Sequence, residues 1–533
     1  MALGEKISED LDISRICWQI GQIYFVKSEP NKALNYAQKS LKLQKKLDNQ
    51  LGIAASLTLL GGAYYSKGEF DQALKFCRQS LKIKEISERT KLDTLQPLTA
   101  IYREKGELSR AVRWYNRAIK LAEKLNYTDE LVLNLLGIGV TYRMMGEHKK
   151  AIFNLKRSLT LSVDSKYLYG IIPSLFYLVL LNLDKNSRKE AQRYLEKLEE
   201  HIKQTETKIY TQAYLIAKSL VLKTSGRIRN RTEAEILLKQ IAEDDFTPPQ
   251  LHLLSLINLC DLILEELYIT NNPDILDEIS PLINKIFEIA EKKHSYLWLT
   301  ETKLLQAKLA LIQMNIEEAK NLFTQAQNVA EMNGLNLLAI KISSEYDNLL
   351  EQLSIWDTLK KKDAPMSERM KLASLSGVID RMLGKRAIVP PKLHPEEPVL
   401  LLIITQGGIP LFSNPFTEEL TFEHELIGSF LTAFNDFSGE FFSKGLDRAK
   451  FGDYKILLES LGDFSACYLF KGQTYLAKKK LKKFVERIQD NTPTWQTLNR
   501  FYELNQLAEL KDIPYIETLI NEIFISKSLR KAL

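Results

Sequence analysis

Apolar side chains recur at steps of three and four along residues 14 to 359, and no run in this stretch alternates between apolar and polar positions. That spacing predicts amphipathic helices throughout. Breaks in the pattern divide the stretch into helix pairs, of which about eight are expected. The first two pairs are predicted at 16–25 with 32–47 and at 53–65 with 72–87.

Small residues and a tyrosine return at fixed distances within these pairs. The first set is Gly21, Tyr24 and Ala33; the same types recur at Gly61, Tyr64 and Ala73 and at Gly139, Tyr142 and Ala151, with Tyr102 and Ala111 in an intervening pair. A period of about 40 residues is typical of stacked helix pairs, because one pair cannot bury its apolar faces alone. We expect each glycine to face the alanine of the following helix, and each tyrosine to fill the wedge between pairs.

The turns inside the pairs also share a residue. The strings SKGEFDQA, EKGELSRA and MMGEHKKA place glycine at positions 68, 106 and 146. Glycine after a helix suits the left-handed backbone that terminates it. These glycines therefore predict where the first helix of each pair ends.

Over residues 14–167 the order of small residue, tyrosine and alanine resembles the tetratricopeptide repeat (TPR). The usual repeat has 34 residues, and the extra residues here lengthen the second helix. The resemblance implies a mainly α fold, with a TPR-type α-solenoid over residues 1–359 whose first helices line a groove for a protein or peptide. Repeats of this length look like those of peptide-sensing regulators and Leu-Gly-Asn scaffold proteins.

Candidate groove residues are those of the first helices that do not occupy the packing positions. They are Arg15, Trp18, Gln22, Phe25, Tyr65, Arg103, Leu136, Arg143 and Phe176. Arg103 and Arg143 hold the same slot in successive pairs, so they are expected side by side and ready for an acidic segment. The alternative is that these side chains pack on neighbouring helices or face solvent. The Lys and Asn residues of a clamp for a terminal carboxylate are missing from these slots, so that subclass is not expected.

Residues 360–398 have a different character. Nine basic and three acidic side chains lie between 360 and 395, a local excess of +6 that equals the net charge of the chain. One amphipathic helix is predicted at 367–385, and prolines at 390, 391, 395 and 398 prevent it from continuing. The pattern favours a solvated linker between two domains. The alternative is a contact for an acidic partner or an anionic membrane surface.

From residue 399 the apolar pattern is that of a small α+β domain. It predicts two strands joined by a tight turn at 406–408, a helix at 422–442, three strands at 446–451, 454–459 and 464–471, and a helix at 475–489. This order, with the string GGIPLF, resembles the longin and roadblock modules over residues 399–490, with 491–533 as a helical extension. The resemblance implies a second protein partner, with small GTPases and trafficking adaptors as its class.

Composition and charge exclude several classes of protein. A net charge of +6 over 533 residues is too small for a dedicated nucleic-acid binder. The longest apolar runs, 399–404 and 175–181, are far shorter than the roughly 20 residues of a membrane span. The widely separated cysteines, which suit neither a zinc motif nor a disulfide framework, are Cys17, Cys77, Cys260 and Cys467. Since the N-terminus also lacks a secretory signal, a cytoplasmic location is expected.

The sequence offers little reaction chemistry. It holds no phosphate-binding glycine loop and no HExxH motif, and its six histidines are scattered. No catalytic residue, metal or cofactor is expected, and Gly407–Gly408 is predicted to form a hairpin turn rather than a ligand contact. We therefore predict a non-enzymatic scaffold for protein–protein interaction. The alternatives are a peptide- or metabolite-sensing regulator that acts through rearrangement of the superhelix, and an enzyme hidden in the C-terminal module.

The substitution Tyr64→Ala tests the stacking of helix pairs. Removing a ring from the wedge between two pairs is expected to lower the free energy of unfolding by roughly 2–4 kcal/mol. Thermal unfolding followed by circular dichroism measures the change. A melting temperature equal to that of the unchanged protein would show that Tyr64 is not buried between pairs.

Overall fold

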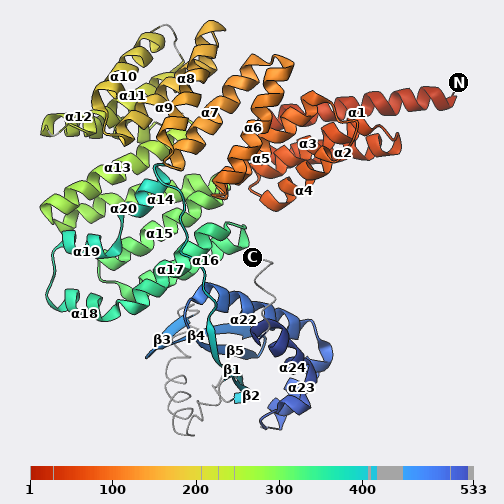
Figure 1. The fold of residues 1–533 in the computed structure, drawn as a ribbon, viewed down its shortest axis with the longest axis vertical. Coiled ribbons are helices and arrows are strands. Elements are labelled where there is room, and N and C mark those ends of the chain that lie inside the picture. Colours follow the sequence, from red (N-terminus) through yellow and green to blue (C-terminus); the bar gives the residue numbers. More distant parts are fainter. Residues whose placement is uncertain are drawn as a thin grey trace. The chain divides into compact units, whose positions relative to one another are not determined.

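The computed structural model describes residues 2–27, 29–203, 205, 207–225, 227–244, 247–405, 410–416, 448–504 and 506–525. The chain divides into two compact units (Figure 1). The first comprises Met1–Lys308, Val329–Leu337 and Pro365–Ile388. The second comprises Leu309–Asn328, Leu338–Ala364 and Val389–Leu533.

The first unit is built from consecutive helix pairs joined by short turns (Figure 1). From α1 to α14 each helix packs against the next along the chain. Among the described residues eight pairs are present, as the apolar pattern predicts, and the eighth is divided between the units. The pairs are α1 (Ala2–Val26) with α2 (Pro30–Lys46), α3 (Gln50–Ser66) with α4 (Phe70–Leu81), α5 (Glu88–Glu104) with α6 (Leu108–Leu125), α7 (Thr128–Met144) with α8 (His148–Asp164), α9 (Leu168–Asp184) with α10 (Arg188–Ile202), α11 (Lys208–Lys223) with α12 (Ile228–Ala242), α13 (Pro249–Thr270) with η1 (Pro273–Ile275) and α14 (Leu276–Lys292), and α15 (Tyr296–Ile312) with α16 (Ile316–Met332).

The glycines of the first helices lie where the two helices of a pair cross. A β-carbon built on Gly21, Gly61 or Gly139 would stand 3.5 Å from the carbonyl oxygen of Ala33, Ala73 or Ala151, respectively. These three alanines, and Ala111 in the third pair, have no exposed surface. The two helices thus approach each other through positions where side-chain atoms are few.

The repeated tyrosines stack on the second helix of their own pair. Tyr24 lies parallel to Tyr36 with ring centroids 5.7 Å apart, and Tyr64 lies parallel to Phe76 at 5.3 Å. Both tyrosines also pack against the apolar cluster that joins the first two pairs. Of the other two, Tyr102 is buried and Tyr142 is partly buried.

The three turn glycines have the left-handed backbone that the sequence predicts. Their φ angles are +75° at Gly68, +73° at Gly106 and +73° at Gly146. Gly68 has a second constraint, because its β-carbon would lie 2.5 Å from the carbonyl oxygen of His294. The turn after α3 is therefore in contact with the turn before α15, within the first unit.

The described strands of the second unit form a five-stranded antiparallel sheet in the order β2-β1-β5-β4-β3. The sheet and its helices agree with the predicted small α+β domain. One face packs against α22, α23 and α24, while the other face of β1 is also buried, which explains the continuous apolar run from residue 399. The elements are α17 (Asn336–Glu351), α18 (Leu353–Lys361), β1 (Glu397–Thr405), β2 (Pro410–Pro415), β3 (Arg448–Phe451), β4 (Tyr454–Leu461), β5 (Phe464–Lys471), α22 (Thr474–Gln489), α23 (Thr492–Glu503), η2 (Leu510–Asp512), α24 (Pro514–Ile520) and η3 (Asn521–Ile525).

A buried arginine joins the sheet of the second unit to α16 and α17. The Arg448 side chain is 1% exposed and lies 3.7 Å from Asp347. Its guanidinium donates to Ser343 Oγ at 3.2 Å and stacks over the Tyr346 ring at 4.5 Å. Asp347 also accepts the backbone N–H of Thr474, at the start of α22, at 3.0 Å. The second compact unit thus contains most of α17 together with the sheet.

Two sequence predictions fall outside the described residues. They are the turn at 406–408, including Gly407–Gly408, and the helix at 422–442. Within the described residues, no helix is both long and apolar enough to cross a membrane.

The four cysteines are free thiols. Burial raises the pKa of Cys77, Cys260 and Cys467 to about 12. These three thiols are therefore protonated at neutral pH and are poor nucleophiles.

The substitution Gly61→Ala tests the close approach of α3 and α4. The added β-carbon would stand 2.4 Å from Cys77 Sγ, so the free energy of unfolding is expected to fall by about 1–3 kcal/mol, although alanine favours a helix. Gly377→Ala is the control, because its β-carbon meets no atom within 4 Å. The double variant with Cys77→Ala should recover part of the loss in a thermal melt. Equal melting temperatures for the two glycine variants would contradict the packing argument.

Candidate functional site

The candidate residues on α1 pack against the second pair. Trp18 donates its Nε1–H to the carbonyl oxygen of Ala55 at 3.3 Å, and Phe25 lies 3.2 Å from the position that a β-carbon of Gly62 would take. Gln22 is partly buried. Arg15 is exposed and lies 3.8 Å from Asp12 on its own helix. Contacts between helices therefore explain why aromatic side chains are present at Trp18 and Phe25.

Tyr65 and Arg103 meet in one polar cluster. The Tyr65 hydroxyl donates to Glu104 Oε1 at 2.6 Å, and Arg103 Nη1 donates to the Tyr115 hydroxyl at 3.3 Å. Burial raises the pKa of Glu104 above its ordinary value, although the bond from Tyr65 opposes the shift. Burial likewise raises the pKa of Tyr65. The cluster links α3, α5 and α6.

The apolar candidates lie in the cores between pairs. Leu136 packs against a buried cluster of α8 and α9, and Phe176 is 5% exposed and meets Tyr177 edge to face. The Phe176 ring is therefore not free to seat an apolar anchor of a partner.

Arg143 is engaged by an acid of the next pair. Its Nε donates to Asp184 Oδ2 at 2.5 Å and its Nη2 to Oδ1 at 3.2 Å, and the two side chains are 5% and 9% exposed. The expectation that Arg143 stands ready for an acidic segment is therefore wrong, because Asp184 already balances its charge. A third donor, Nη1, bonds the carbonyl oxygen of Leu383 at 3.2 Å.

Leu383 belongs to a part of the chain that comes back to the first unit. We call Pro365–Ile388 the return segment. The single helix predicted at 367–385 is two short helices, α19 (Met366–Ala373) and α20 (Ser376–Met382), because Ser374 has a left-handed backbone with φ 51°. Val378, Ile379 and other apolar side chains of the segment are buried. The solvated linker favoured by its charge is therefore replaced by packed structure over these residues.

Both ends of α19 are held by side chains of the first unit. Asn271, which follows α13, accepts the backbone N–H of Ser367 through Oδ1 at 2.8 Å. At the other end, Lys308 Nζ on α15 donates to the carbonyl oxygen of Ala373 at 2.5 Å. These are the backbone groups that a helix leaves without internal partners. A cation at the C-terminal end also suits the helix dipole.

The helix α20 is held by a buried ion pair and by Arg143. The Arg381 guanidinium donates from Nε to Glu301 Oε1 at 2.7 Å and from Nη2 to Oε2 at 2.9 Å. The carbonyl oxygen of Leu383, just after α20, accepts the bond from Arg143. Four residues make these contacts, and Asp184 pairs with one of them, Arg143. We call the five together the groove wall: Arg143, Asp184, Asn271, Glu301 and Lys308.

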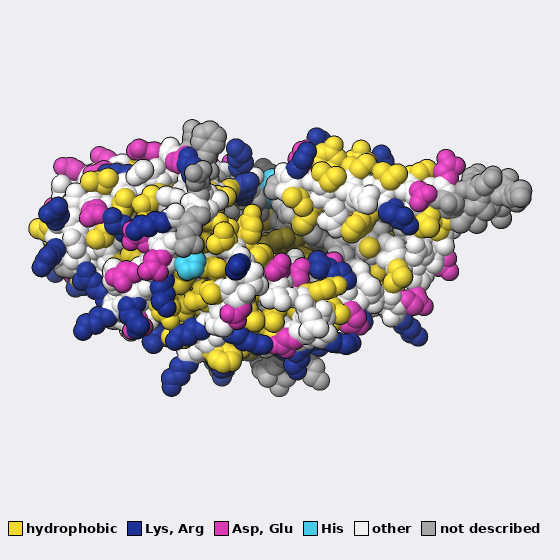
Figure 2. All heavy atoms as spheres, turned by 90° about the horizontal axis from the view of Figure 1, so that it is seen from above, with side chains coloured by type: hydrophobic (Ala, Val, Ile, Leu, Met, Phe, Trp, Pro, Cys, Tyr) yellow, Lys and Arg dark blue, Asp and Glu magenta, His cyan; other side chains and the backbone are white. Residues whose placement is uncertain are grey.

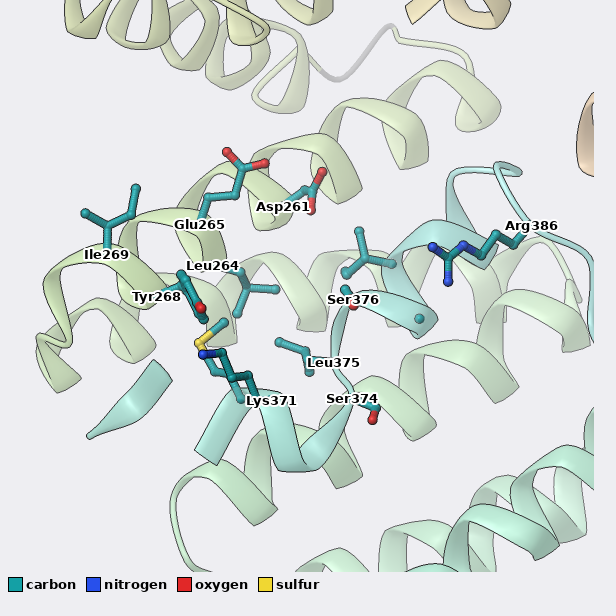
Figure 3. Close-up of a pocket in the computed structure, with 13 residues that line it drawn as sticks. Asp261, Leu264, Glu265, Tyr268, Ile269, Lys371, Ser374, Leu375, Ser376 and Arg386 are labelled. Atoms are coloured by element: carbon teal, nitrogen blue, oxygen red, sulfur yellow. The ribbon is translucent and has the colours of Figure 1, made fainter. Parts of the chain in front are cut away.

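Two cavities lie between the return segment and the helices of the first unit. The larger measures about 590 Å³, with Asp261, Glu265 and Tyr268 of α13 on one side and Lys371 and Arg386 of the return segment on the other (Figure 3). The second measures about 350 Å³ and is lined from α9, α11 and α13 together with Leu383 and Lys385. The segment thus does not fill the space available to it.

A strongly basic patch would mark a nucleic-acid site, and clustered His, Cys, Asp or Glu side chains would mark a metal site. Basic and acidic side chains are interspersed over the face shown in Figure 2. Among the described residues, no three His, Cys, Asp or Glu side chains are placed to hold a metal ion.

Sequence reasoning missed four of the five groove-wall residues: Asp184, Asn271, Glu301 and Lys308. A signal for two of them exists in α15. Glu301 and Lys308 are seven residues apart, on the helix face that also carries Leu304 and Leu311. Charged residues within an apolar stripe indicate a buried polar partner, here on the return segment.

Comparisons with known proteins agree with the repeat pattern. Residues 20–355 match the family described as the MalT-like TPR region. No curated protein matches the chain significantly.

Several solved structures are similar to part of the chain. A Rap protein complexed with Competence and Sporulation Factor is 14% identical, with a TM-score of 0.44, and the match covers 70% of this chain and 99% of that one. The apo form of RapI is 16% identical, with a TM-score of 0.43, and the match covers 52% of this chain and 99% of RapI. NprR in complex with its cognate peptide NprX is 14% identical, with a TM-score of 0.39, and the match covers 64% of this chain and 99% of NprR.

The substitution Asn271→Gly tests the support of α19. Glycine keeps the left-handed backbone of this position (φ 54°) but removes the side chain that caps α19. Loss of a cap costs about 1 kcal/mol, so backbone amides of residues 367–370 should exchange with deuterium about 5-fold faster. Asn126→Gly is the control, since Asn126 has the same backbone (φ 56°) after α6. Equal exchange in both variants would contradict capping by Asn271.

Proposed function

The chain belongs to the family of the MalT-like TPR region, and on that premise we propose that it is a non-enzymatic scaffold for protein–protein interaction. Its helix stack binds a short helical segment of a partner protein along the groove wall. The observation that carries the proposal is the return segment, which the same wall holds by the ends of its helices.

The wall contacts suit a polypeptide because most of them reach the backbone. Asn271, Lys308 and Arg143 bond one N–H and two C=O groups of the return segment. Every protein segment carries such groups, whereas a small metabolite would have to supply them in this spacing. Helices as short as α19 are not stable in water by themselves, so support at both ends is what a bound short helix needs.

Apolar burial supplies the affinity, and the polar contacts supply orientation. Leu375, Val378, Ile379 and Met382 of the return segment are each at most 6% exposed. Burying such a side chain contributes roughly 1.5–3 kcal/mol. The buried pair of Glu301 and Arg381 contributes much less net energy, since desolvation offsets most of its attraction, but it fixes the register.

A second partner site is proposed for the C-terminal module. The order of its strands and α22 supports a longin- or roadblock-like module for 399–490. A small GTPase as its partner, and a cytoplasmic location for the protein, stay predictions that rest on the sequence.

A peptide- or metabolite-sensing regulator remains the second candidate, and one contact bears on it. The turn at Gly68 touches the turn at His294 within the first unit. A change in the pitch of the helix stack would have to break this contact. The contact therefore offers a place where a sensing rearrangement could be measured.

Photo-crosslinking tests the proposed groove. A benzoylphenylalanine placed at Leu220, which lines the smaller cavity, is expected to crosslink a partner segment in lysate, with the attachment point located by mass spectrometry. The control position is Phe153, which is 67% exposed on α8. Arg143→Met, which removes one backbone contact, should weaken the crosslink several-fold. Crosslinks that are equally strong from Phe153, or that attach outside helical segments, would contradict the proposal.

A further inference from the structure

The return segment occupies the surface that a partner needs. Resting on the proposed function, we infer that Pro365–Ile388 is a resident competitor for the groove wall and that the partner is a helix-forming protein segment that displaces it and carries an arginine for Glu301. Three observations carry this inference: the pairing of Arg381 with Glu301, the dependence of the segment on the wall, and the space beside the segment.

A buried acid of the wall selects one basic side chain of the return segment. Five basic and two acidic side chains give the segment a net charge of +3. Glu301 receives both arms of the Arg381 guanidinium, and Asp261 lies 4.0 Å from Lys385 Nζ. Asp261 and Glu265 line the larger cavity (Figure 3), but both already pair with Lys223, and Glu265 also pairs with Arg231. An occupant with an arginine opposite Glu301 is therefore the one that this surface favours.

Glu301 makes the choice of an arginine specific. Its side chain is 4% exposed, and that of Arg381 is 7% exposed. A planar guanidinium can make two parallel bonds to one carboxylate, whereas an ammonium group is a point charge without that fork. An acidic residue in the same place would put a second carboxylate beside a buried one, which is strongly unfavourable.

The return segment depends on the wall for its helical structure. Its helices α19 and α20 have eight and seven residues, too few for stability in water alone. A left-handed residue stands before them at Asp363 and another between them at Ser374. Loss of the wall contacts would therefore release the segment as a unit, with a gain of chain entropy.

The space beside the segment gives a partner an advantage. The larger cavity is open to solvent, and the segment lines it with Ser374, Ser376 and Gly377, which have small side chains or none. A β-carbon on Gly377 would meet no atom within 4 Å. A partner with larger apolar residues at these positions would bury surface that the resident segment leaves unburied.

Competition of this kind predicts how affinity depends on the resident segment. If the wall is open only in a small fraction of molecules, the apparent dissociation constant of a partner is raised by the inverse of that fraction. A substitution in the segment that weakens its hold on the wall should tighten binding of a partner to the same wall.

The test uses a fluorescein-labelled synthetic peptide with the sequence of residues 365–388 as the probe, and the full chain as the binding protein. Fluorescence anisotropy measures its affinity for the unchanged protein and for Arg381→Gln. The variant should bind the peptide at least about 10-fold more tightly, because its own segment competes less well. Arg386→Gln is the matched control, since Arg386 is 70% exposed and lies 3.1 Å from Asp380 of the same segment.

Two further arms test the chemistry of the partner. Adding Glu301→Gln to Arg381→Gln should weaken peptide binding about 10-fold or more, because the acceptor of the peptide's arginine is lost. A peptide with Arg381→Glu should not bind either protein. Equal affinity of the unchanged protein and Arg381→Gln, or binding of the acidic peptide, would overturn the inference. So would a concentration-dependent dimer of Arg381→Gln, which would make a second copy the occupant.

Hydrogen exchange of the full chain separates this inference from the proposed function. Arg381→Gln should speed exchange at residues 366–388 and leave α13 and α15 unchanged. If the segment loosens and no peptide binds, the groove wall is not a binding surface and the proposed function fails. If the peptide binds the unchanged protein while 366–388 stay protected, the groove function holds and displacement is wrong.

Discussion

The fold of the first unit depends on the missing side chains at its helix crossings. Where α1, α3 and α7 meet their partner helices, a β-carbon added to the glycine would stand 3.5 Å from the carbonyl oxygen of a fully buried alanine and 2.4–2.8 Å from a neighbouring side chain. Close crossings bring the backbones together, so each pair presents a flat apolar face to the next. Stacking of these faces sets the row of first helices from which Arg143, Glu301 and Lys308 project.

Charged side chains on the first helices can be paired with an opposite charge and still donate hydrogen bonds. Arg143 is neutralised by Asp184, yet it retains a donor for a backbone carbonyl of α20. Lys308 and Asn271 likewise reach main-chain groups of α19. These contacts reach the ends of short helices of the chain itself, and Glu301 adds a paired bond to the Arg381 side chain.

The sequence was sufficient for the local structure and insufficient for the site. Periodicity located the helix pairs, and the turn glycines located helix ends, because both depend on residues close in sequence. The groove wall depends on distant pairs: Arg143 and Leu383 are 240 residues apart, and Glu301 and Arg381 are 80 apart. The density of charge in 360–398 favoured a solvated linker, since nothing local shows that Arg381 has a buried partner. The repeat position of Arg143 identified it as a candidate. Its partner Asp184 lies in the next helix pair, and nothing in the sequence pattern pointed to it.

The shared position of Asp347 has a consequence for proteolysis. This carboxylate on α17 meets Arg448 of the sheet and caps the start of α22, so a helix of the repeat region belongs to the core of the second unit. A protease that nicks the proline-rich stretch at 390–395 would cut the chain without releasing the C-terminal fragment. The two pieces would remain associated through Arg448, whose buried cation has its counter-ion on the other piece.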